Sequence, residues 1–268
     1  MAIRVVVAGA TGWVGKALVP AVLGEADLEL AGAVARNAAG ADAGTATGPE
    51  ACGIAVAATL EEALSLPSDG VVDYTKPHVV KGHVLAAIGA GRNVVVGTSG
   101  LGADDYAEIA AAAEGKGVGV IAAGNFSITA TLMKRFALMA AKFVPDVEVI
   151  DYASAKKPDA PSGTARELAE ALSAVRGVST AQPQSEVSGV PATRGAAVGA
   201  GAGVQVHALR MPSFVLSCEA LFGLPDERLT IRHDAGSSAA PYVAGTLLAV
   251  RRVVGMKGLV RGLDRLID

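Results

Sequence analysis

The chain has 268 residues, of which 51% are hydrophobic and 18% are charged, and it carries 33 glycines where average usage is roughly 7% of residues. This composition excludes an intrinsically disordered protein and allows one large domain or two modest ones. The formal net charge of -3, without any block of lysine and arginine, argues against a nucleic acid or a membrane surface as partner, so we expect a small-molecule ligand.

Targeting and metal signals are missing from the sequence. No segment is long and apolar enough for a membrane span, and the chain enters its first strand pattern without the hydrophobic region and cleavage site of a signal peptide. We therefore expect a cytoplasmic protein. The two cysteines, Cys52 and Cys218, show no C-x-x-C spacing, so we expect neither a disulfide framework nor a metal site, and both should lie in the core.

The first half of the sequence predicts alternating strands and helices. Apolar runs predict strands at residues 3–8, 28–34, 71–74, 93–96 and 119–122. Helical spacing of apolar residues predicts helices at 12–23, 79–90 and 103–114. Short apolar strands that alternate with helices are typical of a parallel sheet covered on both faces. Residues 1–125 are therefore predicted to form an α/β domain of the Rossmann type, with a doubly wound parallel sheet that binds a dinucleotide.

The alternation of strand and helix patterns ends after Asn125. The pattern predicts a helix at 128–143, a strand at 147–154, a helix from about Thr164, and a Ser/Gly/Pro-rich stretch at 176–203. Three strand patterns at 204–211, 214–222 and 228–233 follow one another with short turns, which predicts antiparallel connectivity. We expect residues 126–240 to form a second, open-faced sheet domain. Helical patterns at 242–254 and 259–267 predict that residues 241–268 pack back on the first domain.

The motif GATGWVG lies where the first predicted strand turns into the first helix. Its glycines let the backbone approach a pyrophosphate and direct the helix N-terminus at it. The alternative is a tight turn that binds nothing. The predicted cofactor contacts of this turn are Gly9, Thr11, Gly12, Trp13, Val14 and Gly15.

The end of the second predicted strand indicates which nucleotide is bound. An NAD enzyme would carry a carboxylate here for the ribose 2'-hydroxyl, but residues 33–37 read AVARN and contain none. Arg36 can instead hold a 2'-phosphate through charge-assisted hydrogen bonds. We therefore expect NADPH, with NADH less favoured. The alternative is an arginine that only solvates a strand end.

Polar segments follow three more predicted strands, at residues 73–77, 97–100 and 123–127. Each is an ordinary turn by itself, but a doubly wound sheet gathers all three at the edge that binds the ligand. The predicted cofactor contacts in these segments are Tyr74, Thr75, Gly97, Thr98, Ser99, Gly124, Asn125 and Phe126.

The segment KKPDAPSGTARE, residues 156–167, predicts an anion site. A turn of Ser162, Gly163 and Thr164 that opens a helix offers free N–H groups and the positive end of the helix dipole to a carboxylate, with Lys157 as a nearby cation. The alternative is a capping box between Thr164 and Glu167 with solvated lysines, although a cap and a site can share residues.

Together with GATGWVG, the segments VVDYTKP, VVVGTSGL, GNFSITATLM and KPDAPSGTA resemble the dihydrodipicolinate reductase family of lysine and diaminopimelate synthesis. The resemblance covers essentially the whole chain. It implies a Rossmann domain, a mixed-sheet domain for substrate binding and tetramerisation, and hydride transfer from NAD(P)H to a cyclic imine dicarboxylate. Matching motifs assign cofactor contacts to Gly9, Gly12, Gly15, Arg36, Gly97, Thr98 and Asn125, and the substrate carboxylate and catalytic lysine positions to Lys157, Ser162, Gly163 and Thr164.

The sequence also departs from that family. The usual E-x-H-H-x-x-K segment has Ala153 and Ser154 in place of both histidines, and the later H-x-A-x-x-R segment ends at Ser238 instead of arginine. Alanine transfers no proton. Two explanations remain. In the first, the protein is a reductase whose substrate arrives protonated or takes its proton from Lys157, Tyr152 or solvent. In the second, the protein is a catalytically silent NADPH-binding or regulatory homologue. We favour reduction, with Lys157 as the catalytic residue.

These departures leave two substrates open: the lysine-pathway imine and a related cyclic imine of secondary metabolism. Tyr152 precedes Ala153 on a strand and should face the opposite side, which disfavours it as the acid. Ser154 and His233 complete the predicted substrate site. His78 and His83 are spaced i, i+5 on a predicted helix, which does not suit a metal pair, so we expect surface or helix-cap residues.

Overall fold

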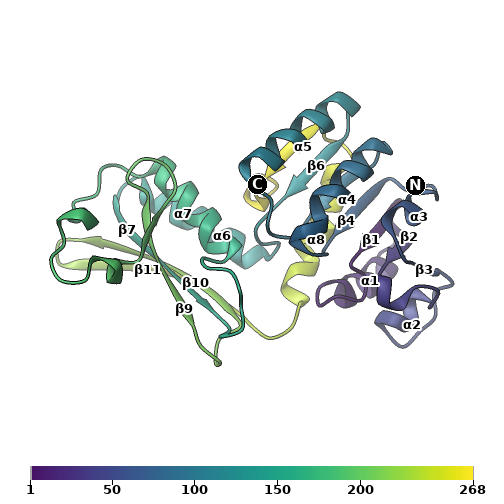
Figure 1. Cartoon of the computed structure of the whole chain (residues 1–268), viewed down its shortest axis with the longest axis horizontal. Coiled ribbons are helices and arrows are strands. Elements are labelled where there is room, and N and C mark those ends of the chain that lie inside the picture. Colours follow the sequence, from purple (N-terminus) through teal and green to yellow (C-terminus); the bar gives the residue numbers. More distant parts are fainter. Residues whose placement is uncertain (1, 268) are drawn as a thin grey trace. The chain divides into compact units, whose positions relative to one another are not determined.

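The computed structural model describes residues 2–267, which divide into two compact units (Figure 1). The first unit ends at Ile128 and resumes at Ala239, and the second unit is Thr129–Ser238. Within the described residues, every helix is too short or too polar to cross a membrane.

A parallel sheet of seven strands forms the centre of the first unit. The strands are β1 (Ile3–Ala8), β2 (Leu28–Val34), β3 (Val56–Ala57), β4 (Gly70–Asp73), β5 (Asn93–Val96), β6 (Gly119–Ala122) and β12 (Gly258–Arg261). Their order is β12-β6-β5-β4-β1-β2-β3, so the winding direction reverses between β1 and β4. This order confirms the predicted doubly wound sheet of the Rossmann type.

Helices cover both faces of this sheet (Figure 1). They are α1 (Gly15–Gly24), α2 (Ala43–Thr47), α3 (Leu60–Leu64), α4 (Pro77–Gly89), α5 (Ala103–Lys116) and α8 (Ala240–Val253), with short 3-10 turns at Arg36–Ala38 and Leu263–Arg265. Leu18 of α1 and Val250 of α8 belong to the core on one face. Val84 of α4 and Ile109 of α5 belong to the core on the other. Burial on both faces explains why the strands are apolar throughout.

The predicted helix at residues 259–267 is wrong. The segment Gly258–Arg261 is strand β12, which pairs in parallel with β6 so that Leu259 lies opposite Val120, and only Leu263–Arg265 forms a helical turn. Glycines at 258 and 262 interrupt the helical pattern, and the free edge of β6 accepts the four residues 258–261. A pairing partner distant in sequence has overridden the local periodicity.

The second unit contains a mixed sheet of five strands in the order β11-β10-β7-β9-β8. The strands are β7 (Asp146–Ala153), β8 (Ala196–Val198), β9 (Val204–Arg210), β10 (Leu216–Leu224) and β11 (Glu227–Ala235). Apolar residues of α6 (Ile128–Ala141) and α7 (Gly163–Val175) join one core with the inner face of this sheet. An α/β fold with a second, mixed sheet is therefore confirmed.

The predicted connectivity of the last three strands is only partly right. β10 and β11 are antiparallel neighbours, but β7 lies between β9 and β10 and pairs in parallel with β9. The connection from β9 to β10 is long enough to cross one strand, since neighbouring strands are about 4.8 Å apart.

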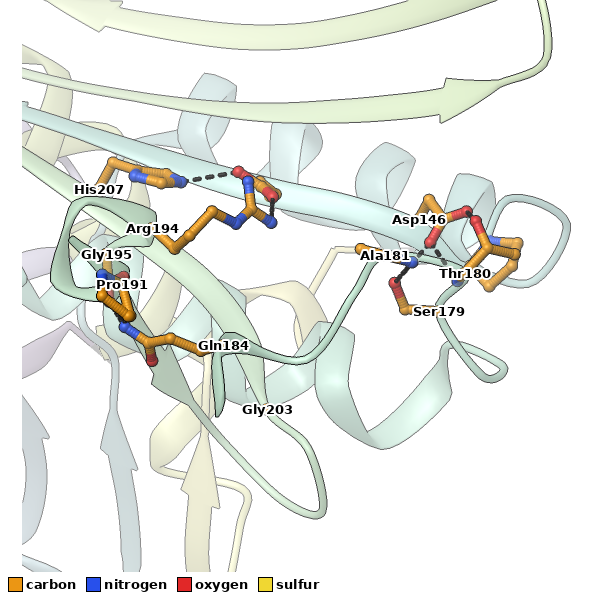
Figure 2. A network of polar contacts seen from close by, with 12 residues as sticks. Asp146, Ser179, Thr180, Ala181, Gln184, Pro191, Arg194, Gly195, Gly203 and His207 are labelled. Carbon is orange, nitrogen blue, oxygen red and sulfur yellow. Dashed lines mark hydrogen bonds and ion pairs between the residues drawn. The ribbon is translucent and has the colours of Figure 1, made fainter. Parts of the chain in front are cut away.

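The Ser/Gly/Pro-rich stretch at 176–203 is fastened to the second sheet by polar contacts (Figure 2). Asp146 accepts hydrogen bonds from the hydroxyls of Ser179 and Thr180, and Glu148 binds both Arg194 and His207. His207 is thereby tied to this loop on the sheet.

Candidate functional site

The glycine turn after β1 is packed tightly against the end of β4. Gly9 has a φ of 84°, and a Cβ atom there would lie 2.2 Å from the carbonyl oxygen of Tyr74. A Cβ atom on Gly15 would lie 2.2 Å from the carbonyl oxygen of Gly9. Side chains at these positions would displace the turn, so glycine is needed to keep the backbone at this edge of the sheet.

The N-terminus of α1 fits an anion. Its N-cap is Val14, whose side chain accepts no hydrogen bond, so the first N–H groups of the helix have no side-chain cap. Gly12 folds the turn by donating its N–H to the carbonyl of Gly9, at 2.9 Å. Trp13 is half exposed and meets Tyr242 edge-on, with ring centroids 5.5 Å apart. A pyrophosphate would supply the missing acceptors of this helix end.

The end of β2 offers a cation and no free carboxylate. Arg36 is exposed, and none of the residues 2–267 pairs with it. The next carboxylate along the chain, Asp42, accepts N–H groups of Thr45, Cys52 and Gly53, and these backbone hydrogen bonds lower its pKa. Asp42 therefore serves the local fold, and the cation that remains suits a 2'-phosphate.

Two aromatic residues of the predicted cofactor segments pack inward. The hydroxyl of Tyr74 lies 2.7 Å from that of Thr246 on α8, and burial raises the pKa of Tyr74. Its ring meets Phe126 edge-on, with centroids 6.1 Å apart, and Phe126 is fully buried. These two side chains support the edge of the sheet from within.

A buried carboxylate connects the turns after β4 and β5. Asp73 is fully buried and accepts hydrogen bonds from the hydroxyls of Thr75 and Thr98, at 2.7 and 2.6 Å. Nδ1 of His83 lies 2.8 Å from the other carboxylate oxygen. The expectation that His83 is a surface or cap residue is therefore wrong. Its place in the apolar stripe of α4, three residues after Val80, is the sequence signal that could have revealed it.

The remaining predicted cofactor residues lie at the same edge. Gly97 follows β5, and Ser99 and Gly124 are exposed in the turns after β5 and β6. The side chain of Asn125 accepts the N–H of Ser127 at 2.8 Å and shapes the turn after β6. The strands are parallel, so the structure brings all these residues to the carboxyl edge of one sheet.

The segment for which we predict an anion site lies at the N-terminus of α7 in the second unit. Ser162 is the N-cap, and its hydroxyl accepts the N–H of Ala165 at 3.2 Å. The alternative, a capping box between Thr164 and Glu167, does not form, because the N-cap is Ser162, and Glu167 forms an ion pair with Lys134 at 2.6 Å. Gly163 and Thr164 therefore form the first turn of the helix.

Sequence reasoning missed the pair that holds this turn. Asp151 is fully buried and accepts both the N–H and the hydroxyl of Ser162, each at 2.7 Å. Arg210, at the end of β9, binds the same carboxylate at 2.8 Å and also donates to the carbonyl of Asp159. The signal was available, because Asp151 falls at an inward-facing position of β7, in step with the apolar residues Val149 and Ala153.

Lys157 lies in the turn that links β7 to this helix. Its Nζ forms an ion pair with Asp159 at 2.8 Å, and its N–H donates to the carbonyl of Ser154 at 2.9 Å. The lysine side chain is 28% exposed, so it keeps access to solvent.

Ala153, which stands where the family has a histidine, and its neighbour Tyr152 lie on opposite faces of β7. Ala153 is fully buried on the inner face. Tyr152 lies on the other face, where its hydroxyl donates to Glu219 at 3.2 Å and Arg232 stacks over its ring at 4.7 Å. Tyr152 therefore points away from Ala153, as expected for neighbours on a strand.

A row of polar residues crosses the inner face of the second sheet. Asp151, Cys218 and His233 lie directly opposite one another on β7, β10 and β11. Burial raises the pKa of Cys218 to about 12 and lowers the pKa of His233. His233 thus reaches the same inner face as Asp151. Within residues 2–267, no group of three or more Asp, Glu, His or Cys side chains is arranged to hold a metal ion.

Comparisons with known proteins agree along the whole chain. The model for the N-terminus of dihydrodipicolinate reductase matches residues 3–126, and the model for its C-terminus matches residues 128–267. The 4-hydroxy-tetrahydrodipicolinate reductase of Synechococcus elongatus is 38% identical over 99% of this chain and 98% of its own, and that of Streptococcus suis is 38% identical over the full length of both. A dipicolinate-bound dihydrodipicolinate reductase from Paenisporosarcina sp. TG-14 covers both chains fully, with a TM-score of 0.79 and 29% identity.

Proposed function

Because the chain belongs to the dihydrodipicolinate reductase family, we propose that it uses NADPH to reduce a small carboxylated cyclic imine. The chain is an NAD(P)H-dependent oxidoreductase of this type. The substrate we propose is hydroxytetrahydrodipicolinate, as in lysine biosynthesis, or a related imine of a secondary pathway.

The first unit would hold the cofactor, corresponding to the predicted domain of residues 1–125 with 241–268. The uncapped N-terminus of α1 would receive the pyrophosphate and Arg36 the 2'-phosphate, while the turns after β4, β5 and β6 would receive the rest of the molecule. When bound, the nicotinamide supplies a hydride.

The second unit would hold the substrate, corresponding to the predicted domain of residues 126–240. The N–H groups of Gly163 and Thr164 and the ammonium group of Lys157 would bind a carboxylate, and Asp151 keeps their turn in place through Ser162. Ser154 and His233 are further proposed contacts. The single observation that carries this proposal is the α7 N-terminus, fixed by a buried ion pair and preceded by a lysine.

Reduction of an imine also requires a proton on the substrate nitrogen. Ala153 cannot donate one, and Tyr152 lies on the other face of β7. Lys157 is the proposed source, because its side chain is partly exposed to solvent, which can reprotonate the ammonium group. An iminium substrate that arrives protonated would need no donor.

An absorbance assay at 340 nm tests the function with hydroxytetrahydrodipicolinate and a panel of cyclic imino acids. Turnover of the first compound supports the lysine pathway, and turnover of another imine supports a secondary pathway. Replacing Lys157 by Ala should lower kcat by about 10²-fold or more, and an unchanged kcat would remove its role as the acid. If the protein binds NADPH but reduces none of the compounds, it is a silent homologue and our proposal is wrong.

The cofactor preference predicts the effect of Arg36→Ala. We expect the Kd of NADPH to rise about tenfold while the Kd of NADH stays unchanged, because only NADPH carries the 2'-phosphate. Calorimetric titration of both nucleotides measures this difference. Arg228→Ala, which removes an exposed arginine of the second unit, is the control and should change neither value. Equal affinity of the native protein for the two nucleotides would contradict the preference.

A further inference from the structure

The carboxylate of Asp73 is buried at a position where it must be stabilised by hydrogen-bond donors from neighbouring residues. Asp73 is the last residue of β4, lies in the middle of the sheet between β1 and β5, and is fully buried. A buried carboxylate is costly unless hydrogen bonds satisfy both of its oxygens. The donors to Asp73 therefore determine the conformation of the chain around it.

Oδ1 of Asp73 binds the two turns that follow β4 and β5. It accepts the N–H of Thr75 at 3.1 Å and the hydroxyls of Thr75 and Thr98 at 2.7 and 2.6 Å. The hydroxyl oxygen of Thr98 in turn accepts the N–H of Thr75 at 2.7 Å. Both hydroxyls and the N–H of Thr75 are thus engaged within this cluster, and the carboxylate of Asp73 holds the two turns together.

Oδ2 of Asp73 binds a single side chain, His83, at 2.8 Å. His83 comes from α4, and 21% of its side chain is exposed, whereas Asp73 is not exposed at all. Because the carboxylate accepts, Nδ1 of the imidazole is the donor in this contact. Without that donor Oδ2 would be buried and unsatisfied, and the carboxylate would turn away from the threonines to find another partner.

The strand order indicates which half of the cofactor these turns would meet. In a doubly wound sheet the dinucleotide lies across the point where the order reverses, with one nucleotide on each half. The half with β2 carries Arg36, the proposed partner of the adenosine 2'-phosphate. The half with β4 and β5 carries Asp73 and would receive the nicotinamide nucleotide.

We propose that His83 is a positioning residue for the cofactor: through Asp73 it fixes the turns at residues 74–77 and 97–100 in the conformation that receives the nicotinamide half of NADPH. This inference rests on the proposed function. In this role His83 acts through the carboxylate that it binds.

The test uses the two nitrogens of the imidazole ring. The side-chain amide of asparagine can take the place of Nδ1 as the donor to Oδ2 of Asp73. The side-chain amide of glutamine takes the place of Nε2 instead, and it lies too far from the backbone to donate to Oδ2. We expect His83→Asn to bind NADPH within about twofold of the native protein. We expect His83→Gln and His83→Leu to raise the Kd of NADPH about tenfold. His78→Leu, which alters an exposed histidine of the same helix, should have no effect.

Adenosine 2',5'-bisphosphate serves as a second ligand in the same titrations, because it carries the adenosine half of NADPH alone. All variants should bind it like the native protein, and kcat should change less than the KM of NADPH. The inference is overturned if His83→Leu and His83→Gln bind NADPH like the native protein, or if they weaken the bisphosphate equally, which would indicate general loosening of the sheet. If His83→Leu does not fold, the comparison of the Kd of NADPH between His83→Asn and His83→Gln decides the test. A native protein that binds neither ligand overturns the proposed function itself, and the inference with it.

Discussion

The two cysteines show how much position changes the chemistry of a residue. Cys218 lies in the core of the second unit, where burial raises its pKa to about 12, and Cys52 is partly exposed in the first unit. At pH 8 a thiol with that pKa is ionised in about one molecule in ten thousand. The thiolate is the reactive form, so Cys218 is inert in the folded protein.

This difference predicts the outcome of alkylation. Iodoacetamide should modify Cys52 of the native protein at least about 100-fold faster than Cys218 at pH 8, measured by peptide mass spectrometry after timed quenching. In concentrated urea both cysteines should react at similar rates, which serves as the control. Comparable labelling of both residues in the native protein would contradict the burial of Cys218.

Single residues differ in how far the sequence reveals them. The glycine turn was predictable, because its spacing between a strand and a helix has a direct physical reason. The partners of Asp73 and Asp151 were not, since His83 and Arg210 reach them from other elements and nothing local in the sequence states which side chains will meet. Buried carboxylates among apolar strand residues are the signal that partners must exist.

Among the elements, α7 combines a helix cap with the proposed carboxylate site. The hydroxyl of Ser162 accepts the N–H of Ala165 and donates to Asp151, so one atom serves both the helix and the sheet. Loss of that atom should affect folding and binding together.

We expect Ser162→Ala to lower the free energy of unfolding by about 1–2 kcal/mol, as for other N-cap substitutions, and to raise the KM of the imine substrate about tenfold. Urea denaturation and steady-state kinetics measure the two effects. Ser188→Ala, in the exposed loop at 176–203, is the matched control and should change neither. An unchanged KM with reduced stability would restrict Ser162 to a structural role.

A helix or strand was predictable where its own apolar pattern determines its structure. It was not predictable where the structure depends on pairing with a strand distant in sequence. The long helices and the buried strands of the first unit follow from apolar periodicity. The strand β12 and the insertion of β7 between β9 and β10 depend on which edge is free when the sheet assembles. That information lies outside any local stretch of sequence.

For the whole molecule, the fold class followed from the alternation of strands and helices in the first half and its end after Asn125.

The proposed cofactor site lies entirely in the first unit, so ligand binding should stabilise that unit. At 100 times its Kd, NADPH should add about 2.7 kcal/mol and raise the melting temperature by about 5–10 °C. Calorimetric scans with NADH at the same concentration are the comparison. Equal shifts for the two nucleotides would argue against the role of Arg36.

The assembly of the chain is a further prediction at this scale. We propose a homotetramer, supported by an apolar stripe that runs from α6 into the turn after it, in which Phe136, Met139 and Phe143 are 51%, 59% and 78% exposed. Light scattering after gel filtration should give four times the mass of the chain. Phe143→Asp should reduce that mass if the stripe contributes to the contact, whereas Leu66→Asp in the first unit should not. A monomeric native protein would contradict the proposal.

The last strand of the first sheet also affects how the protein is synthesised. When the ribosome has translated residue 238, six of the seven strands exist, but β12 is missing from the edge of β6 and α8 is missing from the apolar face that holds Leu18. An unpaired edge and an uncovered face of this kind invite pairing with other chains. The nascent chain must therefore carry an incomplete first unit while the whole inserted unit is made. The first unit becomes complete only when α8 and β12 have been translated.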